Sequence, residues 1–308
     1  MSTEGGTRAI IAALLANLGI AVTKFIAYLI SGSTSMLAES VHSLADSGNQ
    51  VLLIIGGRRS TRAATPEHPF GFGRERYVSA FLVSIILFSV GGVFSIYEGV
   101  HKIEHPEPIE VPWLPIAVLL ISIGLESFSL RTALRESAEQ RRGISILQFV
   151  RRAKAPELPV VVLEDIAALL GLTLALVGVS AAVLTGNGVW DGVGTIGIGL
   201  LLVAVAVLLG IETQSLLVGE GASPADTEAI RAAATAGADV QRIIHMKTLY
   251  LGPEELLVAM KVAVTPTQSA AAVAAAINAL EARVRAAVPA ARVMYIEPDI
   301  DDPTRPAG

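Results

Sequence analysis

Four polar residues recur on one side of an otherwise apolar segment near the N-terminus. In the stretch MLAESVHSLADSGNQ they are spaced by three, four and three residues: Glu39, His42, Asp46 and Asn49. A helix has about 3.6 residues per turn, so all four would lie on one stripe, with His42 and Asp46 one turn apart. A carboxylate inside a membrane helix costs about 2.5–3.5 kcal/mol and normally serves an ion, a proton or a partner residue. The alternative is a polar stripe that holds two helices together.

A second pair of acidic residues lies in a later apolar segment, PVVVLEDIAALLG. Glu164 and Asp165 fall about two turns into the helix that we expect there. Adjacent residues are about 100° apart on a helix, so the two side chains cannot point the same way. We expect Asp165 to face the centre of the molecule, with Glu164 either completing a site or pairing elsewhere. The alternative is that both stay hydrated near the cytoplasmic face.

Together the two segments offer an imidazole and carboxylates from separate helices. This combination suits Zn²⁺, and also Mn²⁺, Fe²⁺ or Co²⁺, whereas Ca²⁺ and Mg²⁺ sites are normally built from oxygen alone. Zinc prefers four ligands, one of which can be water, and His42, Asp46 and Asp165 would supply three. A histidine with a reference pKa of about 6.5 links metal occupancy to proton occupancy, which is what a metal/proton exchanger needs.

The composition is that of a membrane protein. The chain has 308 residues, of which 52% are hydrophobic and 17% are charged, and its charged residues are segregated along the sequence. The net charge of −5 gives no reason to expect a nucleic-acid partner. Because there is no cysteine, a metal site must use His, Asp, Glu or amide oxygen. We expect no resident cofactor, the metal being a transported substrate.

Six segments are long enough to cross a hydrocarbon core of about 30 Å, which takes about 20 helical residues. They run approximately over 9–30, 34–57, 77–101, 112–132, 159–185 and 189–217. Arginines gather in the links after the second and fourth segments, so these links and both termini should be cytoplasmic. The first apolar run lacks an obvious cleavage site, and we interpret it as a retained span. We expect a multi-pass protein of a bacterial-type plasma membrane.

After residue 217 the composition becomes that of a soluble domain. The patterns predict a helix, two strands, a second helix and a final strand over 224–236, 240–250, 254–264, 269–288 and 292–296. This order is typical of a small α+β domain of the ferredoxin-like kind. We therefore divide the chain into a six-helix transmembrane domain (1–217), a C-terminal cytoplasmic domain (218–298) and a tail (299–308) that should be disordered.

These motifs resemble the cation diffusion facilitator family of divalent-metal transporters over nearly the whole chain. SMLAESVHSLADSGNQ is similar to the family's second-span motif, in which His or Asp is followed four residues later by Asp, here His42 and Asp46. EHPFGFGRERY is similar to the family's cytoplasmic loop of the form HPYGHGRAE. With LEDIAALLG and the downstream TGN, the pattern is most similar to the branch of solute carrier family 30 that includes zinc transporter nine. The resemblance implies a homodimer that exports zinc, or a related divalent cation, by proton antiport.

The fifth-span motif departs from the family pattern. The family usually has His or Asp four residues before the aspartate that matches Asp165, and this chain has Val161 there. One ligand that the resemblance implies is therefore missing. Candidates to replace it are water and three side chains: Glu164, Glu39 and Asn49.

The loop and the C-terminal domain also depart from the family pattern. Phe72 stands where the loop has its second histidine, which leaves His68 alone. His245 falls near a position where relatives place a ligand, but Met260 and Ile296 stand where other ligands would be expected. Both histidines are therefore weaker metal candidates, and the resemblance implies that this domain serves dimerisation.

Three other functions compete with transport. A metal-responsive membrane scaffold or regulator would fit the missing fifth-span ligand. A passive channel would need a continuous polar stripe along several spans, and the third, fourth and sixth offer few polar residues; among them we attribute Glu126 to helix packing or closeness to the cytoplasmic end. An enzyme is the weakest alternative, because no nucleophile, base and orienting group recur at a readable spacing.

Overall fold

The computed structural model describes residues 4–31, 34–106, 113–141, 143–237 and 240–300. The chain divides into two compact units. One comprises Met1–Arg59 with Glu75–Gln214, and the other comprises Ser60–Arg74 with Ser215–Gly308. The loop that carries the HPFGFG motif thus groups with the C-terminal part of the chain. Of the tail expected to be disordered, residues 301–308 lie outside the described part.

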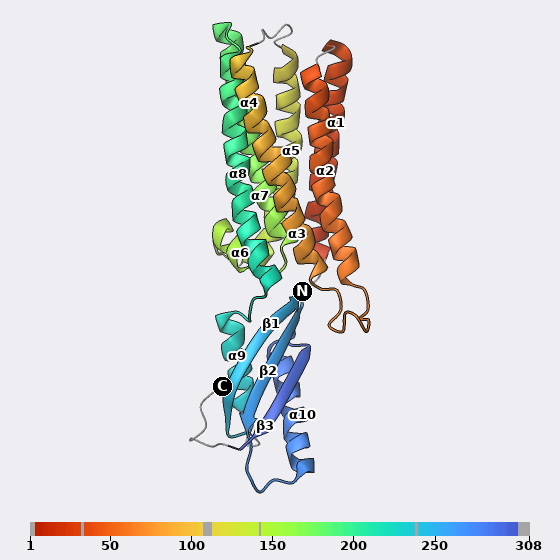
Figure 1. The fold of residues 1–308 in the computed structure, drawn as a ribbon, viewed down its shortest axis with the longest axis vertical. Coiled ribbons are helices and arrows are strands. Elements are labelled where there is room, and N and C mark those ends of the chain that lie inside the picture. Colours follow the sequence, from red (N-terminus) through yellow and green to blue (C-terminus); the bar gives the residue numbers. More distant parts are fainter. Residues whose placement is uncertain (1–3, 32–33, 107–112, 142, 238–239, 301–308) are drawn as a thin grey trace. The chain divides into compact units, whose positions relative to one another are not determined.

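The first unit is a bundle of long helices (Figure 1). Its elements are α1 (Glu4–Ser31), α2 (Thr34–Ser60), α3 (Glu75–Ile86), η1 (Leu87–Val93), α4 (Phe94–Glu104), α5 (Trp113–Arg141), α6 (Ile146–Arg152), α7 (Glu157–Thr185) and α8 (Val189–Val218). The π-helical segment η1 joins α3 and α4 into one continuous span.

Five segments of the described chain are long and apolar enough to cross a membrane: Gly6–Ile30, Glu75–Glu104, Trp113–Arg141, Glu157–Thr185 and Val189–Val218. They coincide with five of the six expected spans. The remaining expected span, 34–57, coincides with α2, which carries the polar stripe. The described residues of α2 do not meet the same requirement of length and apolar character. The structure therefore defines a helical membrane unit with five candidate spans.

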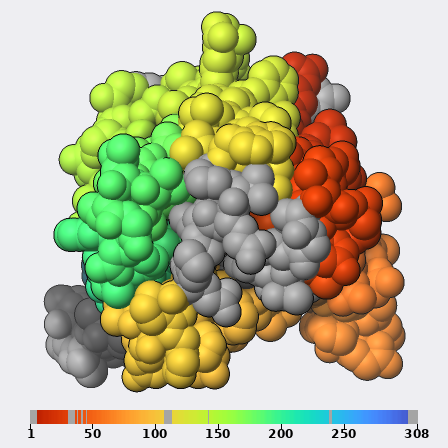
Figure 2. All heavy atoms as spheres, turned by 90° about the horizontal axis from the view of Figure 1, so that it is seen from above, coloured from red at the N-terminus to blue at the C-terminus, as the bar shows by residue number. Residues whose placement is uncertain are grey.

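The helices of this unit are arranged around α5 and α7. Viewed along the bundle, α1 and α2 lie at one edge in red and orange, and α8 lies at the opposite edge in green (Figure 2). The α5 helix packs against both α1 and α7. At the end where α3 and α7 begin, the guanidinium of Arg76 pairs with the carboxylate of Glu157 through two hydrogen bonds. This ion pair thus joins the first turns of α3 and α7, while apolar side chains fill the interior of the bundle.

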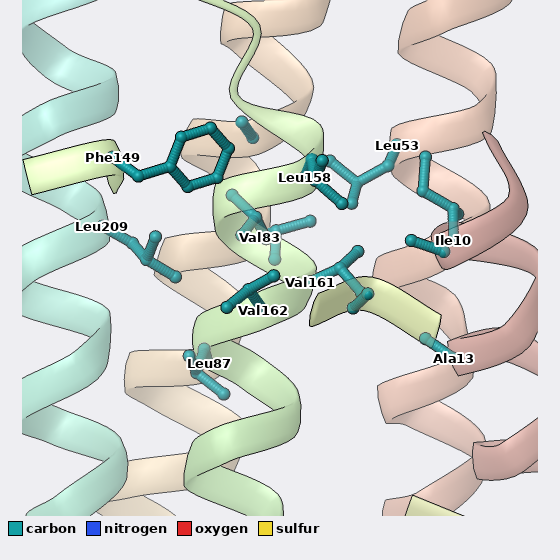
Figure 3. Packing of buried hydrophobic residues seen from close by; sticks show 14 of the residues in the cluster. Ile10, Ala13, Leu53, Val83, Leu87, Phe149, Leu158, Val161, Val162 and Leu209 are labelled. Atoms are coloured by element: carbon teal, nitrogen blue, oxygen red, sulfur yellow. The ribbon is translucent and has the colours of Figure 1, made fainter. Parts of the chain in front are cut away.

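Apolar side chains of α7 form the centre of the core of the unit. Val161 points toward the side of Ile10 and Ala13 of α1, whereas Val162 points toward Leu87 (Figure 3). Both valines are fully buried. Because the β-branched valines of α7 face different neighbours, this helix is enclosed on several sides at its first turns.

Small residues allow α8 to approach two neighbouring helices closely. A Cβ atom added at Gly99 of α4 would lie 2.8 Å from the backbone nitrogen of Ile196 and 2.9 Å from the carbonyl oxygen of Gly192. On another side of α8, a Cβ at Gly178 of α7 would lie 2.9 Å from the carbonyl oxygen of Trp190. Backbones in contact at such distances leave no room for side chains, which is the packing expected of small residues in membrane helices.

The second unit has the predicted order of elements: α9 (Pro224–Thr235), β1 (Arg242–Gly252), β2 (Glu255–Ala263), α10 (Ala270–Ala287) and β3 (Val293–Asp299). The sheet order is β1-β2-β3, with β2 antiparallel to β1 and parallel to β3. Alternate residues of β2 point into a core that α9 and α10 complete with Ile230 and Leu280. The structure therefore confirms a small mixed domain of sheet and helices.

The core of the second unit includes two of the positions at which related proteins would place metal ligands. Met260 is buried, and in the register of β2 and β3 it lies opposite Ile296, which packs against the same core. Beside them, Lys261 pairs with Glu297 at 2.8 Å and with Asp299 at 3.3 Å. The hydrogen bond to Glu297 and the one to Asp299 raise the pKa of the Lys261 ammonium. These two positions thus contribute to packing.

Replacing Gly99 by alanine should lower the thermal stability of the protein. The added methyl group has no room against α8, and overpacking of this kind costs about 1–3 kcal/mol. Gly124→Ala is the matched control, because a Cβ there meets nothing within 4 Å, and alanine favours the helix by up to about 1 kcal/mol. Thermal unfolding in detergent should show a lower midpoint for Gly99→Ala alone. Equal midpoints for the two variants would contradict this packing.

Candidate metal site

Two amide side chains of α2 hold a carboxyl group of α7. The Nδ2 atom of Asn49 donates to Oε1 of Glu164 at 3.1 Å, and the Nε2 atom of Gln50 donates to Oε2 at 3.0 Å. All three residues are buried. A buried carboxyl group needs such donors, because it has lost its hydrogen bonds to water. Glu164 therefore faces α2, and the expectation that it might stay hydrated near the cytoplasmic face is wrong.

The neighbouring carboxyl group on α7 faces α5. Asp165 is 1% exposed, and the hydroxyl of Ser129 donates to its Oδ2 atom at 2.7 Å. Glu126, which lies on α5 three residues before Ser129, is buried as well. The α7 helix thus presents its two acidic residues to two different helices, as their angular offset predicted.

Asp46 completes a group of four acidic residues from three helices. It lies on α2 one turn before Gln50, and it is within electrostatic range of both Glu164 and Glu126. In the described part of the chain, no three His, Asp or Glu side chains are close enough together to hold a metal ion. The side chain of His42 lies outside the described residues, although its backbone belongs to α2.

Glu39, the first residue of the stripe, has a cationic partner. Its carboxylate lies 3.1 Å from the ammonium of Lys24, which also donates a hydrogen bond to Ser43 at 3.0 Å. Lys24 is 8% exposed, so the pair joins α1 to α2 inside the bundle. A buried lysine of a membrane helix needs such a carboxylate, because an isolated buried ammonium is strongly disfavoured.

The two weaker histidine candidates both belong to the second unit. His68 is exposed, and its ring centroid lies 4.6 Å from that of Phe72, the residue that replaces the second histidine of the loop motif. His245 lies in β1 opposite Lys261, and its buried Nδ1 atom has no hydrogen-bond partner among the described residues. An aromatic ring and an ammonium group are not metal ligands, so these neighbours give neither histidine a second donor.

Sequence reasoning missed the contributions of α5 and of Gln50. Glu126, which we attributed to helix packing or closeness to the cytoplasmic end, lies near the middle of α5 and is buried. The signal was present in the spacing: three buried polar residues of α5 follow one another at intervals of four and three, namely Ser122, Glu126 and Ser129. This is the same periodicity that identified the stripe on α2.

Comparisons with known proteins point to one class. A family model described as the cation efflux transmembrane domain matches residues 10–218. The chain is 32% identical over 254 residues to the mitochondrial proton-coupled zinc antiporter SLC30A9 of Xenopus laevis, covering 82% of this chain and 45% of that protein. It is 33% identical over 231 residues to the human protein of the same name, covering 74% of this chain and 41% of the relative. Metal tolerance protein C4 of Arabidopsis thaliana is 30% identical over 257 residues, covering 82% and 56%.

The helical unit and this match together define a multi-pass membrane protein of a transporter class. The chain belongs to the cation efflux family, as its motifs predicted. The family is one of transporters and not of enzymes. The chain spans about half the length of the curated relatives that it matches.

Removing the hydroxyl of Ser129 should destabilise the protein. Ser129→Ala leaves the buried Asp165 carboxyl without one donor, and a hydrogen bond to such a group contributes about 1.5–3 kcal/mol. Ser137→Ala is a control on the same helix, because that buried hydroxyl donates to the Leu134 carbonyl of its own helix and its loss should be close to neutral. Thermal unfolding of the metal-free protein should separate the two variants. A midpoint for Ser129→Ala equal to that of Ser137→Ala would contradict the role of Ser129.

Proposed function

We propose that this chain is a secondary transporter that moves a divalent metal cation, zinc in the first place, out of the cytoplasm in exchange for protons. One observation carries the proposal: α7 presents two adjacent buried carboxyl groups, Glu164 and Asp165, to two different helices inside a membrane unit. Membership of the cation efflux family supports transport, and the printed names of the relatives, proton-coupled zinc antiporters, support zinc and protons as the exchanged ions.

The site that we propose lies between α2 and α7. His42, Asp46 and Asp165 would bind the cation, with Glu164 and Asn49 as further candidates and Glu39 as a less suitable one, since Lys24 already engages it. Zinc, manganese, iron and cobalt ions all accept nitrogen and carboxylate oxygen. The ion is a passing substrate, so a set of weakly held ligands suits its release.

Proton coupling follows from the chemistry of these ligands. A carboxylate or imidazole must give up its proton to bind a metal ion, so protons and metal compete for the same atoms. The carboxyl groups of Glu164 and Asp165 are both buried in the helical unit, where protons and the cation would compete for them. Exposure of the site to the outer side would let protons enter and the cation leave, and exposure to the cytoplasm would reverse the occupancy.

The same proposal includes the topology and the assembly. We take α2 as a sixth span, because it bonds to α1 and α7 within the bundle. Both termini then lie on the side of the arginine-rich links. We assign the second unit a ferredoxin-like fold and a role in forming a homodimer, with the transport domain ending near residue 217 and the cytoplasmic domain spanning 218–298. The bacterial-type plasma membrane stays a prediction from the sequence.

A metal-responsive scaffold or regulator is the second candidate function. The observation that favours it is Val161, an apolar residue at the position where the family usually has a ligand. A scaffold would bind metal without moving it. Measuring metal binding and transport turnover on the same purified protein separates the two functions, because a scaffold would bind with negligible turnover.

Replacing either aspartate of the site should abolish transport. In proteoliposomes with a pH-sensitive dye inside, Asp46→Ala and Asp165→Ala should each lose zinc-dependent proton flux, because each removes a proposed ligand. Glu104→Ala, at an exposed position of α4, is the matched control and should keep the flux. Size-exclusion profiles should show that all variants fold. Normal flux in both aspartate variants would contradict the site.

The transported ion should be identified by competition. Zn²⁺ uptake into vesicles should be inhibited by Co²⁺, Fe²⁺ and Mn²⁺, which accept the same ligands, more strongly than by Mg²⁺ or Ca²⁺, which prefer oxygen alone. The measurement is the concentration of each ion that halves zinc uptake. Inhibition by Mg²⁺ or Ca²⁺ at equal concentrations would contradict an imidazole-containing site.

A further inference from the structure

A groove of about 360 Å³ lies between α5 and α7 on the surface of the helical unit. Its lining is mainly apolar, with Leu130 and Leu134 from α5 and Leu169 from α7. Arg131 and Arg135 of α5, one turn apart, line it as well. Both arginines are exposed. The transport site proposed above uses none of these residues, so the groove needs an explanation of its own.

The two guanidinium groups of this groove lack an acidic partner. Among the residues that the structure describes, neither Arg131 nor Arg135 forms an ion pair. The carboxylate that directly follows Arg135 is engaged elsewhere, because Glu136 accepts a hydrogen bond from the backbone nitrogen of Ala9 at 3.0 Å. Like charges one turn apart on a helix repel each other. An anion bound between the two guanidinium groups would remove this repulsion.

The length of α5 places both arginines at the level of lipid headgroups. Its first residue, Trp113, is 62% exposed, and exposed tryptophan is typical of the boundary between membrane and water. With a rise of about 1.5 Å per residue, Arg131 lies about 27 Å and Arg135 about 33 Å farther along the helix axis. The hydrocarbon core is about 30 Å thick, so the two guanidinium groups reach the opposite headgroup layer. The arginine-rich link that follows α5 assigns this layer to the cytoplasmic side.

The combination of charge and apolar lining narrows the choice of ligand. Two arginines repel a divalent cation, so the groove is unsuited to be an entrance for the transported ion. A small soluble anion would use the guanidinium groups but leave the leucines without a partner. An anionic phospholipid uses both, because arginine binds phosphate through paired hydrogen bonds and apolar side chains accept an acyl chain. Basic pockets between membrane helices on the cytoplasmic side bind headgroups of this kind.

We propose that the groove binds one anionic phospholipid of the cytoplasmic leaflet, with its phosphate between Arg131 and Arg135 and an acyl chain along the leucines of α5 and α7. Inside the bundle, the hydrogen bond from Ser129 to Asp165 joins the same two helices at 2.7 Å. A lipid in the groove would therefore strengthen the contact between α5 and α7 from the membrane side. The inference does not depend on which ion the protein transports.

Lipid binding to the delipidated full-length protein tests the assignment, with native mass spectrometry as the measurement. Titration with dioleoyl phosphatidylglycerol and with dioleoyl phosphatidylcholine gives the affinity for the first lipid bound. The unaltered protein should prefer phosphatidylglycerol about tenfold or more, as expected of two basic residues at a headgroup. The double variant Arg131→Gln/Arg135→Gln should lose this preference. Absence of a preference in the unaltered protein, or its retention in the double variant, would overturn the proposal.

A matched control separates the groove from the general positive charge of this face. Arg151→Gln/Arg152→Gln removes two exposed arginines from α6, outside the groove. This variant should keep the affinity of the unaltered protein for the first phosphatidylglycerol. A loss equal to that of Arg131→Gln/Arg135→Gln would show attraction by diffuse charge and would contradict a defined site.

The apolar part of the groove is tested with both arginines in place. Ser127 is an exposed residue of the same lining, one turn before Arg131. Ser127→Phe would fill the groove, and the affinity for phosphatidylglycerol should fall at least about threefold, the contribution of one buried methylene group. Inorganic phosphate at equal concentration should not displace the lipid. Unchanged affinity in Ser127→Phe, or displacement by phosphate, would replace the lipid site by a simple anion site and overturn the proposal.

Discussion

Carboxyl groups enclosed in an apolar helical bundle are the constraint on which the rest of this structure depends. Each such group costs about 2.5–3.5 kcal/mol inside a membrane helix and must therefore be matched by donors, a proton or a cation. Here the donors are neutral amides and a hydroxyl: Asn49 and Gln50 hold Glu164, and Ser129 holds Asp165. Neutral donors orient a carboxyl group without cancelling its charge. A proton or a cation can therefore still neutralise that charge, which a permanent arginine or lysine partner would already have done.

The packing around this group combines rigid and adjustable parts. The backbones of α4 and α8, and of α7 and α8, approach closely at glycine residues such as Gly99 and Gly178, so these pairs are tightly packed. Between α3 and α4, the π-helical segment η1 interrupts the regular hydrogen-bond pattern within a continuous span. Irregularities of this kind are frequent at functional sites. A transporter needs this contrast, because the bound ion changes its access from one side to the other while its ligands keep their relative positions.

Much of the fold could be predicted from the sequence, because it depends on composition and periodicity along one chain segment. Five of the six expected spans and the order of helices and strands in the second unit agree with the structure. The different directions of Glu164 and Asp165 also followed from helical geometry. Their partners did not follow, because spacing fixes the angle of a side chain on its own helix but not the neighbour that it meets. Glu126 and Ser129 were visible as periodic polar residues, yet only the packing of α5 against α7 gives Ser129 the Asp165 carboxyl group as a partner.

The contrast between Lys24 and Glu126 shows why a polar residue inside the bundle has to be read together with its partner. Lys24 also lies at a depth where a charge is expensive, and its pairing with Glu39 and Ser43 joins α1 to α2 and satisfies its ammonium group. A cation paired with an anion needs no further ion. Glu126 is equally buried, at 2% exposed, but no ion pair with a lysine or arginine is found for it among the described residues. A buried acid without a basic partner needs a proton, a cation or hydrogen-bond donors instead. Burial alone would class these two residues together, whereas their neighbours show that Lys24 is part of an ion pair that joins two helices.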